Sequence, residues 1–126
     1  MKWQYLYNHM TELLPPRAKI IMYLLKKIDD PNFDGFIIVT IQSVAEQVNA
    51  SYATTQKVFK ELQDKGFILK IQNGVYVPLI PVTRLKKKKI YKIAKENEIS
   101  SSATIVKIGK EKYLCPIKAS QYLIEK

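Results

Sequence analysis

The chain of 126 residues has few of the residues that build covalent links or metal sites. Its single cysteine, Cys115, excludes an internal disulfide and a zinc site with several cysteine ligands, and we expect it as a small buried side chain in a strand. Its single histidine, His9, lies among apolar neighbours in a predicted helix, where an imidazole is more often a tolerated side chain than a ligand or base. No metal site is therefore expected.

Residues typical of an active site are also scarce. The four glycines form no glycine-rich phosphate loop, which disfavours an ATP-driven mechanism. Eight tyrosines occur without the histidine pair, or the arginine and histidine set, that accompanies a tyrosine nucleophile in enzymes that cut and join DNA. Asp29, Asp30 and Asp34 could bind a divalent ion, but acidic residues beside a proline more often form a solvated turn. We predict a protein that is not an enzyme and needs no cofactor.

Long apolar runs are absent as well. The longest, such as Phe36–Val39, are far too short to span a bilayer, and the segment Met1–Gln4 lacks the apolar core and cleavage site of a signal peptide. The 47% of hydrophobic residues nevertheless suffices for a packed core. We expect a cytoplasmic protein of one ordinary domain or two very small ones, without a membrane partner.

Acidic residues are few, and the imbalance is concentrated in the C-terminal third. The formal net charge is +10, of which residues 1–80 contribute +2 and residues 81–126 contribute +8. Such a concentration favours a polyanionic partner. Nucleic acid is favoured over a membrane surface because no lipid anchor or strongly amphipathic surface helix accompanies the lysines.

Two helices joined by a tight turn are predicted between residues 40 and 65. Thr40 can cap the first helix, Asn49 tolerates the left-handed conformation at its end, and Ser51 can cap the second. Lys65-Gly66 then ends the second helix. The positions predicted to be buried recur at helical spacing and are Ile41, Val44, Ala45, Val48, Thr55, Val58, Phe59 and Leu62.

A β-hairpin is predicted directly after these helices. Its strands cover residues 67–72 and 75–77, and Asn73-Gly74 is the dipeptide that favours a type I′ turn because both positions need positive φ. The apolar run Phe36–Val39 is expected to add a short strand to the same sheet. A helix, a turn, a second helix and a hairpin follow one another in a winged helix-turn-helix, with the hairpin as the wing.

The run Arg17–Pro81 resembles the winged-helix domain of the small replication initiators of Gram-positive plasmids. The similarity is clearest in SVAEQVNASYATTQKVFKELQDKGFILKIQNGVYVPLIP. The resemblance implies a mobile-element context and a second helix that enters the major groove of DNA. The contacts that it implies come from the outer face of that helix and are Tyr52, Thr54, Gln56, Lys57 and Lys60.

The N-terminal part is predicted to be helical. Trp3, Leu6, Met10, Leu13 and Leu14 recur at helical spacing, and Pro15-Pro16 separates this helix from a second one over Arg17–Ile28. Two roles remain open for the first helix. It either packs on the predicted winged helix or, through its exposed aromatic side chains, binds a second copy of the chain.

The lysine-rich segment Thr83–Asn97 is predicted to be a helix capped by Thr83. A lysine run is often only a solvated surface, but beside a helix-turn-helix we favour phosphate contact, because each neutralised phosphate releases counterions. A hairpin over Thr104–Ile108 and Tyr113–Ile117 follows, and then a short helix over Lys118–Glu125 that buries Ala119, Tyr122 and Leu123.

This C-terminal part, KIYKIAKEN followed by ATIVKIGKEKYLCPIKASQYLIEK, resembles the excisionases of conjugative transposons, which bend DNA. It departs from them in one respect: no clear helix precedes Thr83 that would complete a second helix-turn-helix. The resemblance implies a second DNA contact, made by Lys89, Lys92, Lys107, Lys110 and Lys112.

The predicted fold is α+β, mainly α: a winged helix-turn-helix with an N-terminal helix over residues 1–80, and a basic helix–hairpin–helix extension over residues 81–126. The predicted function is sequence-specific binding of double-stranded DNA in plasmid replication, by a homodimer, with replication proteins of the host or the element as further partners. The alternatives are a repressor or excisionase-like protein, a protein-docking module with Trp3, Tyr5 and Leu6 exposed, and a single-strand-binding module with Tyr76, Tyr91 and Tyr113 stacked on bases. The expected DNA-binding residues are Ser51, Tyr52, Thr54, Gln56, Lys57, Lys60, Lys70, Asn73, Arg84, Lys86, Lys87, Lys88, Lys89, Lys92, Lys107, Lys110 and Lys112.

Overall fold

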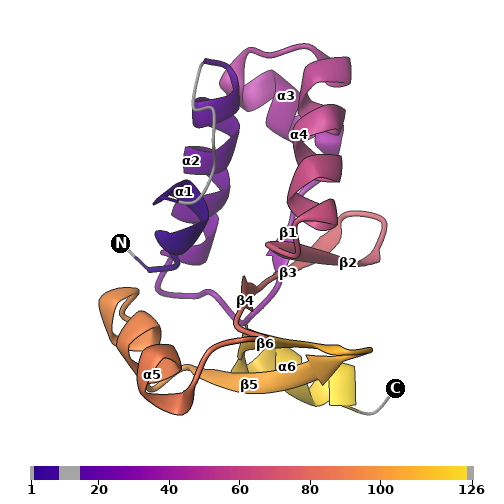
Figure 1. Ribbon diagram of the computed structural model, residues 1–126. Helices are drawn as coiled ribbons and strands as arrows, with labels where there is room; N and C mark the ends of the chain where they lie inside the picture. The colour runs from indigo at the N-terminus through magenta and orange to yellow at the C-terminus, as the bar shows by residue number, and fades with distance from the viewer. Residues whose placement is uncertain (1, 9–14, 125–126) are drawn as a thin grey trace.

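The computed structural model describes residues 2–8 and 15–124, and it has the α+β fold class that the sequence predicts (Figure 1). Its helices are α1 (Tyr5–Asn8), α2 (Arg17–Ile28), α3 (Ile41–Val48), α4 (Tyr52–Asp64), α5 (Lys87–Glu96) and α6 (Ile117–Ile124). Its strands are β1 (Ile37–Ile38), β2 (Ile68–Gln72), β3 (Val75–Pro78), β4 (Ile80–Pro81), β5 (Ala103–Ile108) and β6 (Glu111–Pro116). Two antiparallel sheets result, in the orders β1-β3-β2 and β4-β6-β5. In the figure, α2, α3 and α4 stand above the first sheet, and the second sheet lies below it with α5 at one side.

The helix pair α3–α4 forms as predicted. The Thr40 side chain accepts a hydrogen bond from the Ser43 backbone N–H, and the Ser43 hydroxyl accepts one from the Thr40 N–H, so the two residues form a capping box. Asn49 ends α3 in the left-handed conformation at φ 56°, and Ser51 caps α4 by accepting from the Thr54 N–H. The buried face of α4 is the predicted one, Thr55, Val58, Phe59 and Leu62.

The first sheet contains the predicted hairpin, but the predicted type I′ turn is wrong. Gly74 has φ 80°, whereas Asn73 is not among the residues with positive φ, which a type I′ turn requires at both positions. The pairing also shifts by one residue between Lys70 and Gln72. This bulge changes the geometry at which β2 enters the turn, so the dipeptide alone did not determine the turn type. β1 pairs with β3 and completes the sheet as predicted.

The predicted start of the lysine-rich helix is also wrong. α5 begins after Lys86, and the Thr83 hydroxyl instead donates to the Glu111 carboxylate at 2.5 Å and accepts from the Lys112 N–H at 2.9 Å. The chain before Thr83 forms β4, which pairs with β6 and which the sequence did not predict. Thr83 is thus held by the second sheet and not by the helix.

The N-terminal segment differs from the predicted long helix. Trp3 has φ 61° and lies outside α1, and its N–H donates to the backbone oxygen of Asn97 at 3.3 Å. The Tyr5 N–H donates to the Asn97 side chain at 2.6 Å. Trp3 and Leu6 are buried, so they do not form the exposed apolar patch expected of a docking module. His9, Met10, Leu13 and Leu14 of the predicted helix lie outside the described residues.

One large core crosses from the helices to the second sheet. It joins Phe59 of α4 and Phe67 to Ile90 of α5 and Leu114 of β6. Gly66, at φ 78°, sits where an added Cβ would lie 3.0 Å from the Tyr113 ring, so the end of α4 approaches β6 closely. The division into units at residue 80 stays a prediction.

A smaller apolar cluster lies under α6 and contains Cys115 and Ala119. Cys115 is buried in β6 as predicted, and burial raises the pKa of its thiol from 9.0 to about 12. The prediction that Tyr122 of α6 is buried is wrong. Its side chain is 41% exposed and packs edge-on against Phe36. Among the described residues, no helix combines the length and apolar character that a bilayer crossing requires.

Candidate nucleic-acid interface

The outer face of α4 is polar and open. Tyr52 is 49% exposed, and Gln56, Lys57 and Lys60 are exposed on the side opposite the buried face. Hydroxyl, amide and ammonium groups of this kind can donate to phosphates and reach base edges in the major groove. Both termini of the helix are fixed by its caps, so these side chains project from a defined backbone.

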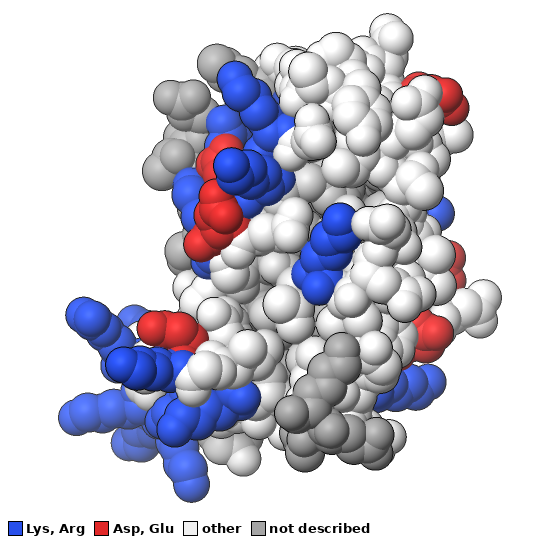
Figure 2. Space-filling view, turned by 90° about the vertical axis from the view of Figure 1, so that its right-hand side faces the viewer, with Lys and Arg blue, Asp and Glu red and all other residues white. Residues whose placement is uncertain are grey.

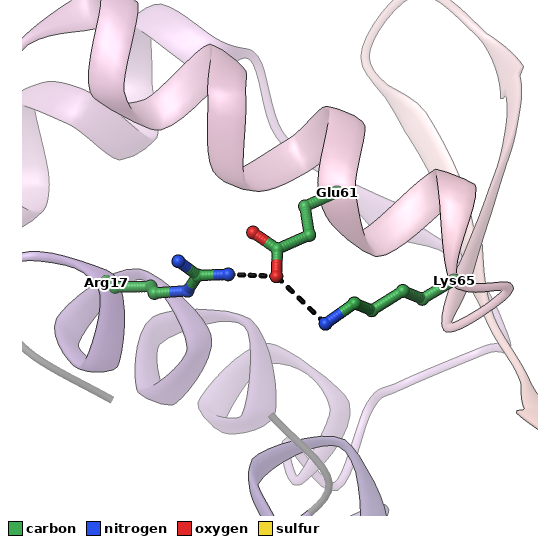
Figure 3. Close-up of polar contacts among 3 residues, drawn as sticks. All are labelled: Arg17, Glu61 and Lys65. Atoms are coloured by element: carbon green, nitrogen blue, oxygen red, sulfur yellow. Dashed lines mark ion pairs between the residues drawn. The ribbon is translucent and has the colours of Figure 1, made fainter. Parts of the chain in front are cut away.

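Glu61, the acidic residue on α4 nearest to these lysines, turns away from this face (Figure 3). Its Oε1 pairs with the guanidinium of Arg17 on α2 and, at 3.1 Å, with the Lys65 ammonium. The Glu61 side chain is 28% exposed, so the two cations hold it in a partly desolvated site between the helices. The carboxylate therefore neutralises the charges of Arg17 on α2 and Lys65 at the end of α4, and it does not pair with Lys57 or Lys60.

A groove of ≈ 430 Å³ brings residues from α3, α4 and the first sheet together. Five of its lining residues come from α4, among them the polar side chains Gln56, Lys57 and Lys60, and Lys70 reaches it from β2. Tyr76 forms part of the lining, with its ring centroid 5.2 Å from that of Phe59. Burial, and secondarily the Tyr52 phenol, raises the pKa of Tyr76 above its ordinary value of 10.0. The groove thus combines three ammonium groups with neutral donors.

Two of the predicted contacts have local structural roles. The Ser51 hydroxyl accepts from the Thr54 N–H at 3.1 Å and donates to the Thr54 hydroxyl at 2.8 Å. Both side chains therefore serve the first turn of α4, and Thr54 is half-buried. Asn73 is exposed in the turn between β2 and β3 and is not part of the groove lining.

The start of α5 holds the densest positive charge. Lys86 occupies the N-cap position, Lys87, Lys88 and Lys89 form the first turn, and that turn contains no acidic residue. A helix N-terminus already carries partial positive charge, so each lysine there is unfavourable by a few tenths of a kcal/mol to about 1 kcal/mol. An adjacent depression of ≈ 480 Å³ has five basic side chains in its lining: Arg84, Lys86, Lys88, Lys89 and Lys92. An anionic partner would offset this repulsion.

The lysines of the second hairpin do not join that depression. Lys107 of β5 lies directly opposite Lys112 of β6, and Lys110 lies in the turn between the strands. Of the five lysines predicted to form a second DNA contact, Lys89 and Lys92 line the depression and the three hairpin lysines do not, and the shared contact stays a prediction. Like charges in direct cross-strand register repel, so this pair also favours an anionic neighbour.

Figure 2 faces the side of α4 and the β2–β3 hairpin and shows how the charge is distributed. Lys and Arg side chains gather most densely at the lower left, at the level of α5 and the second sheet. A second group, mixed with Asp and Glu, lies above it along the same margin. Among the described residues, no three His, Cys, Asp or Glu side chains are grouped as a metal site would require.

The family comparison adds an independent finding. The family model of the Firmicute plasmid replication protein (RepL) matches residues 7–111. The chain belongs to the RepL family. No curated protein and no solved structure matches it.

The RepL match confirms the resemblance to plasmid replication initiators and extends it. The predicted similarity ended at Pro81, whereas the family match continues through α5 and β5. The groove on α4 and the lysines at the start of α5 both lie within the matched region. Much of the segment that resembles excisionases is therefore part of the RepL family pattern.

Four groove residues of this RepL-family chain are absent from the predicted duplex contacts: Ile41, Phe59, Gln63 and Tyr76. Gln63 lies seven positions after Gln56 and three after Lys60, so a helical projection of α4 could have placed it on the same side. Ile41 was predicted to be buried, and its partial exposure at the groove depends on where β2 and β3 pack. No local signal predicts that contact.

Proposed function

We propose that this RepL-family protein binds the replication origin of its plasmid as a sequence-specific duplex DNA-binding protein. In this proposal α3, the turn at Asn49 and α4 act as a helix-turn-helix, the β2–β3 hairpin acts as the wing, and α4 enters the major groove. Gln56 and Tyr52 read base edges, while Lys57, Lys60 and Lys70 hold the adjacent phosphates.

The observation that carries the proposal is the groove on α4, in whose lining the described residues include no carboxylate. Gln56, Lys57, Lys60 and Lys70 line one surface, and Glu61 is paired with Arg17 and Lys65 away from it. A helix face of donors without acceptor carboxylates suits phosphates and the acceptor-rich edge of guanine. Membership of a family of plasmid replication proteins supports DNA as the polyanion.

The lysines at the start of α5 are proposed to bind the flanking backbone. Phosphate contacts increase affinity for any sequence and make it salt-dependent, so these residues contribute affinity and α4 contributes discrimination. We also propose binding as a dimer, in which two copies occupy half-sites about 10 base pairs apart, centre to centre. Footprinting of the origin tests that spacing, and one isolated half-site would refute the dimer.

The test is a titration of purified protein against origin duplex and random duplex over a range of salt concentrations. We expect a preference for the origin of about 10³-fold or more. Gln56→Ala should weaken origin binding by about 5- to 150-fold and leave random duplex unchanged, because a bidentate base contact is worth about 1–3 kcal/mol. Gln121→Ala, at an exposed glutamine of α6, is the matched control and should change neither. Equal binding of both duplexes by the wild type would refute the proposal.

A further inference from the structure

Tyr91 is the most exposed large apolar side chain among the described residues, at 73%. By contrast, Tyr76 is buried and Tyr113 is half-buried, so neither ring is free to stack on a ligand. Lys87 and Lys88 precede Tyr91 by four and three positions, which places their side chains beside the ring on the surface of α5. An exposed ring between ammonium groups remains without a structural role.

A groove of ≈ 270 Å³ lies between this ring and β5. Tyr91 and Lys87 line its α5 side, and Thr104 and Ile105 line its β5 side. A cavity of about 150 Å³ already holds a benzene ring, so this groove has room for a planar nucleobase. Its lining combines apolar surface, hydroxyl groups and one ammonium group, with no carboxylate among the described residues.

Further positive charge continues the groove along β5. Lys107 follows Ile105 by two positions and so lies on the same face of the strand, roughly 7 Å farther along. Lys112 is its cross-strand partner on that face. The groove that Tyr91 lines is thus bordered by lysines of two elements, Lys87 on α5 and the Lys107–Lys112 pair beyond Ile105 on the hairpin.

We propose that this groove binds single-stranded DNA, with one unpaired base stacked on Tyr91 and the flanking phosphates held by Lys87 and Lys88 of α5 and by Lys107 and Lys112 of the β5–β6 hairpin. The inference rests on the proposed DNA-binding function and adds a second form of the same ligand. Bases within a duplex stack on one another and cannot present a face to the ring, whereas an origin must be opened before it is copied. Stacking on aromatic rings beside a basic groove is the usual way in which proteins bind such strands.

The experiment uses the full chain and an oligothymidylate of about 12 nucleotides that carries one 5-iododeoxyuridine. Tyr91→Ala should weaken its binding by about 5- to 150-fold, and Tyr91→Phe should stay within about twofold of the wild type, because phenylalanine keeps the stacking face. Ile38→Ala, which truncates another exposed apolar side chain (68%) in the first sheet, is the matched control and should bind as the wild type does. Ultraviolet cross-linking of the wild type should join the modified base to the peptide that contains Tyr91.

Three results would overturn this inference: a wild type that does not bind the oligothymidylate, a Tyr91→Ala variant that binds it within about twofold of the wild type, or a cross-link to another segment. The second result would leave the groove to a protein partner, such as an acidic peptide. The preference for origin duplex over random duplex is measured separately and should survive in Tyr91→Ala. If the wild type shows no preference for the origin duplex, the proposed function is refuted. Failure of the proposed function is therefore distinguishable from failure of the single-strand inference.

Discussion

Reversing the charge of one side chain at the start of α5 should both raise the stability of the protein and lower its affinity for DNA. Lys88 is in the first turn of α5, where its charge has the same sign as the helix terminus. Each charge at such an exposed position changes the free energy of unfolding by about 0.3–1 kcal/mol, so Lys88→Glu replaces an unfavourable term with a favourable one, and the gain is about 0.6–2 kcal/mol. The melting temperature should rise by roughly 2–8 °C. The introduced carboxylate would also lie four residues before Lys92, in the favourable orientation for a helical ion pair.

The same change should weaken binding to every duplex. One lost phosphate contact lowers the slope of log affinity against log salt by about 1, equally for origin and random DNA. Lys95→Glu is the matched control, because it makes the same charge change in the last turn of the same helix, where it should decrease stability. Thermal unfolding and salt-dependent anisotropy titrations measure the two effects. A lower melting temperature for Lys88→Glu, or an unchanged salt slope, would refute the reasoning.

Three other changes test the supporting structure. Glu61→Gln should decrease the free energy of unfolding, measured by urea titration, by about 1–2 kcal/mol, because it leaves the partly buried Arg17 without its anion. Glu46→Gln, on the exposed side of α3, is the control and should have little effect. Ser51→Ala should cost about 1 kcal/mol and Ser51→Gly only a few tenths, so a fall in origin affinity in the glycine variant would show a DNA contact in addition to the cap. Because the Cys115 thiol keeps its proton up to a pKa of about 12 when folded but loses it near 9.0 when unfolded, stability should decrease between these pH values, and Cys115→Ala should make that decrease smaller. A pH profile of urea midpoints that is identical in the variant would contradict this assignment.

The helix pair was predictable because its signals are local. Thr40, Asn49 and Ser51 act on backbone groups within four residues, and the apolar spacing of α3 and α4 fixes which side is buried. The same local reasoning placed Gln56, Lys57 and Lys60 on one open face.

The errors occur where distant residues decide the outcome. Thr83 has the side chain of a helix cap, but residues 111–112 of β6 satisfy its hydroxyl, 28 and 29 positions away. Trp3 fits a helical pattern, but its backbone bonds to Asn97 at the end of α5. A capping or periodicity rule considers only neighbouring residues, so neither partner could be found from the sequence.

The continuous core fixes the distance between the two proposed DNA contacts. Phe59 of α4 and Ile90 of α5 belong to one packed cluster, and close-packed interiors resist gradual deformation. Under the proposed function, the base pairs read by α4 and the phosphates held by α5 would therefore have to be a set number of base pairs apart along the duplex. Inserting about 5 base pairs between them, half a helical turn, would move one contact to the opposite side of the DNA. An origin that tolerates substitutions in this interval should still reject changes in its length.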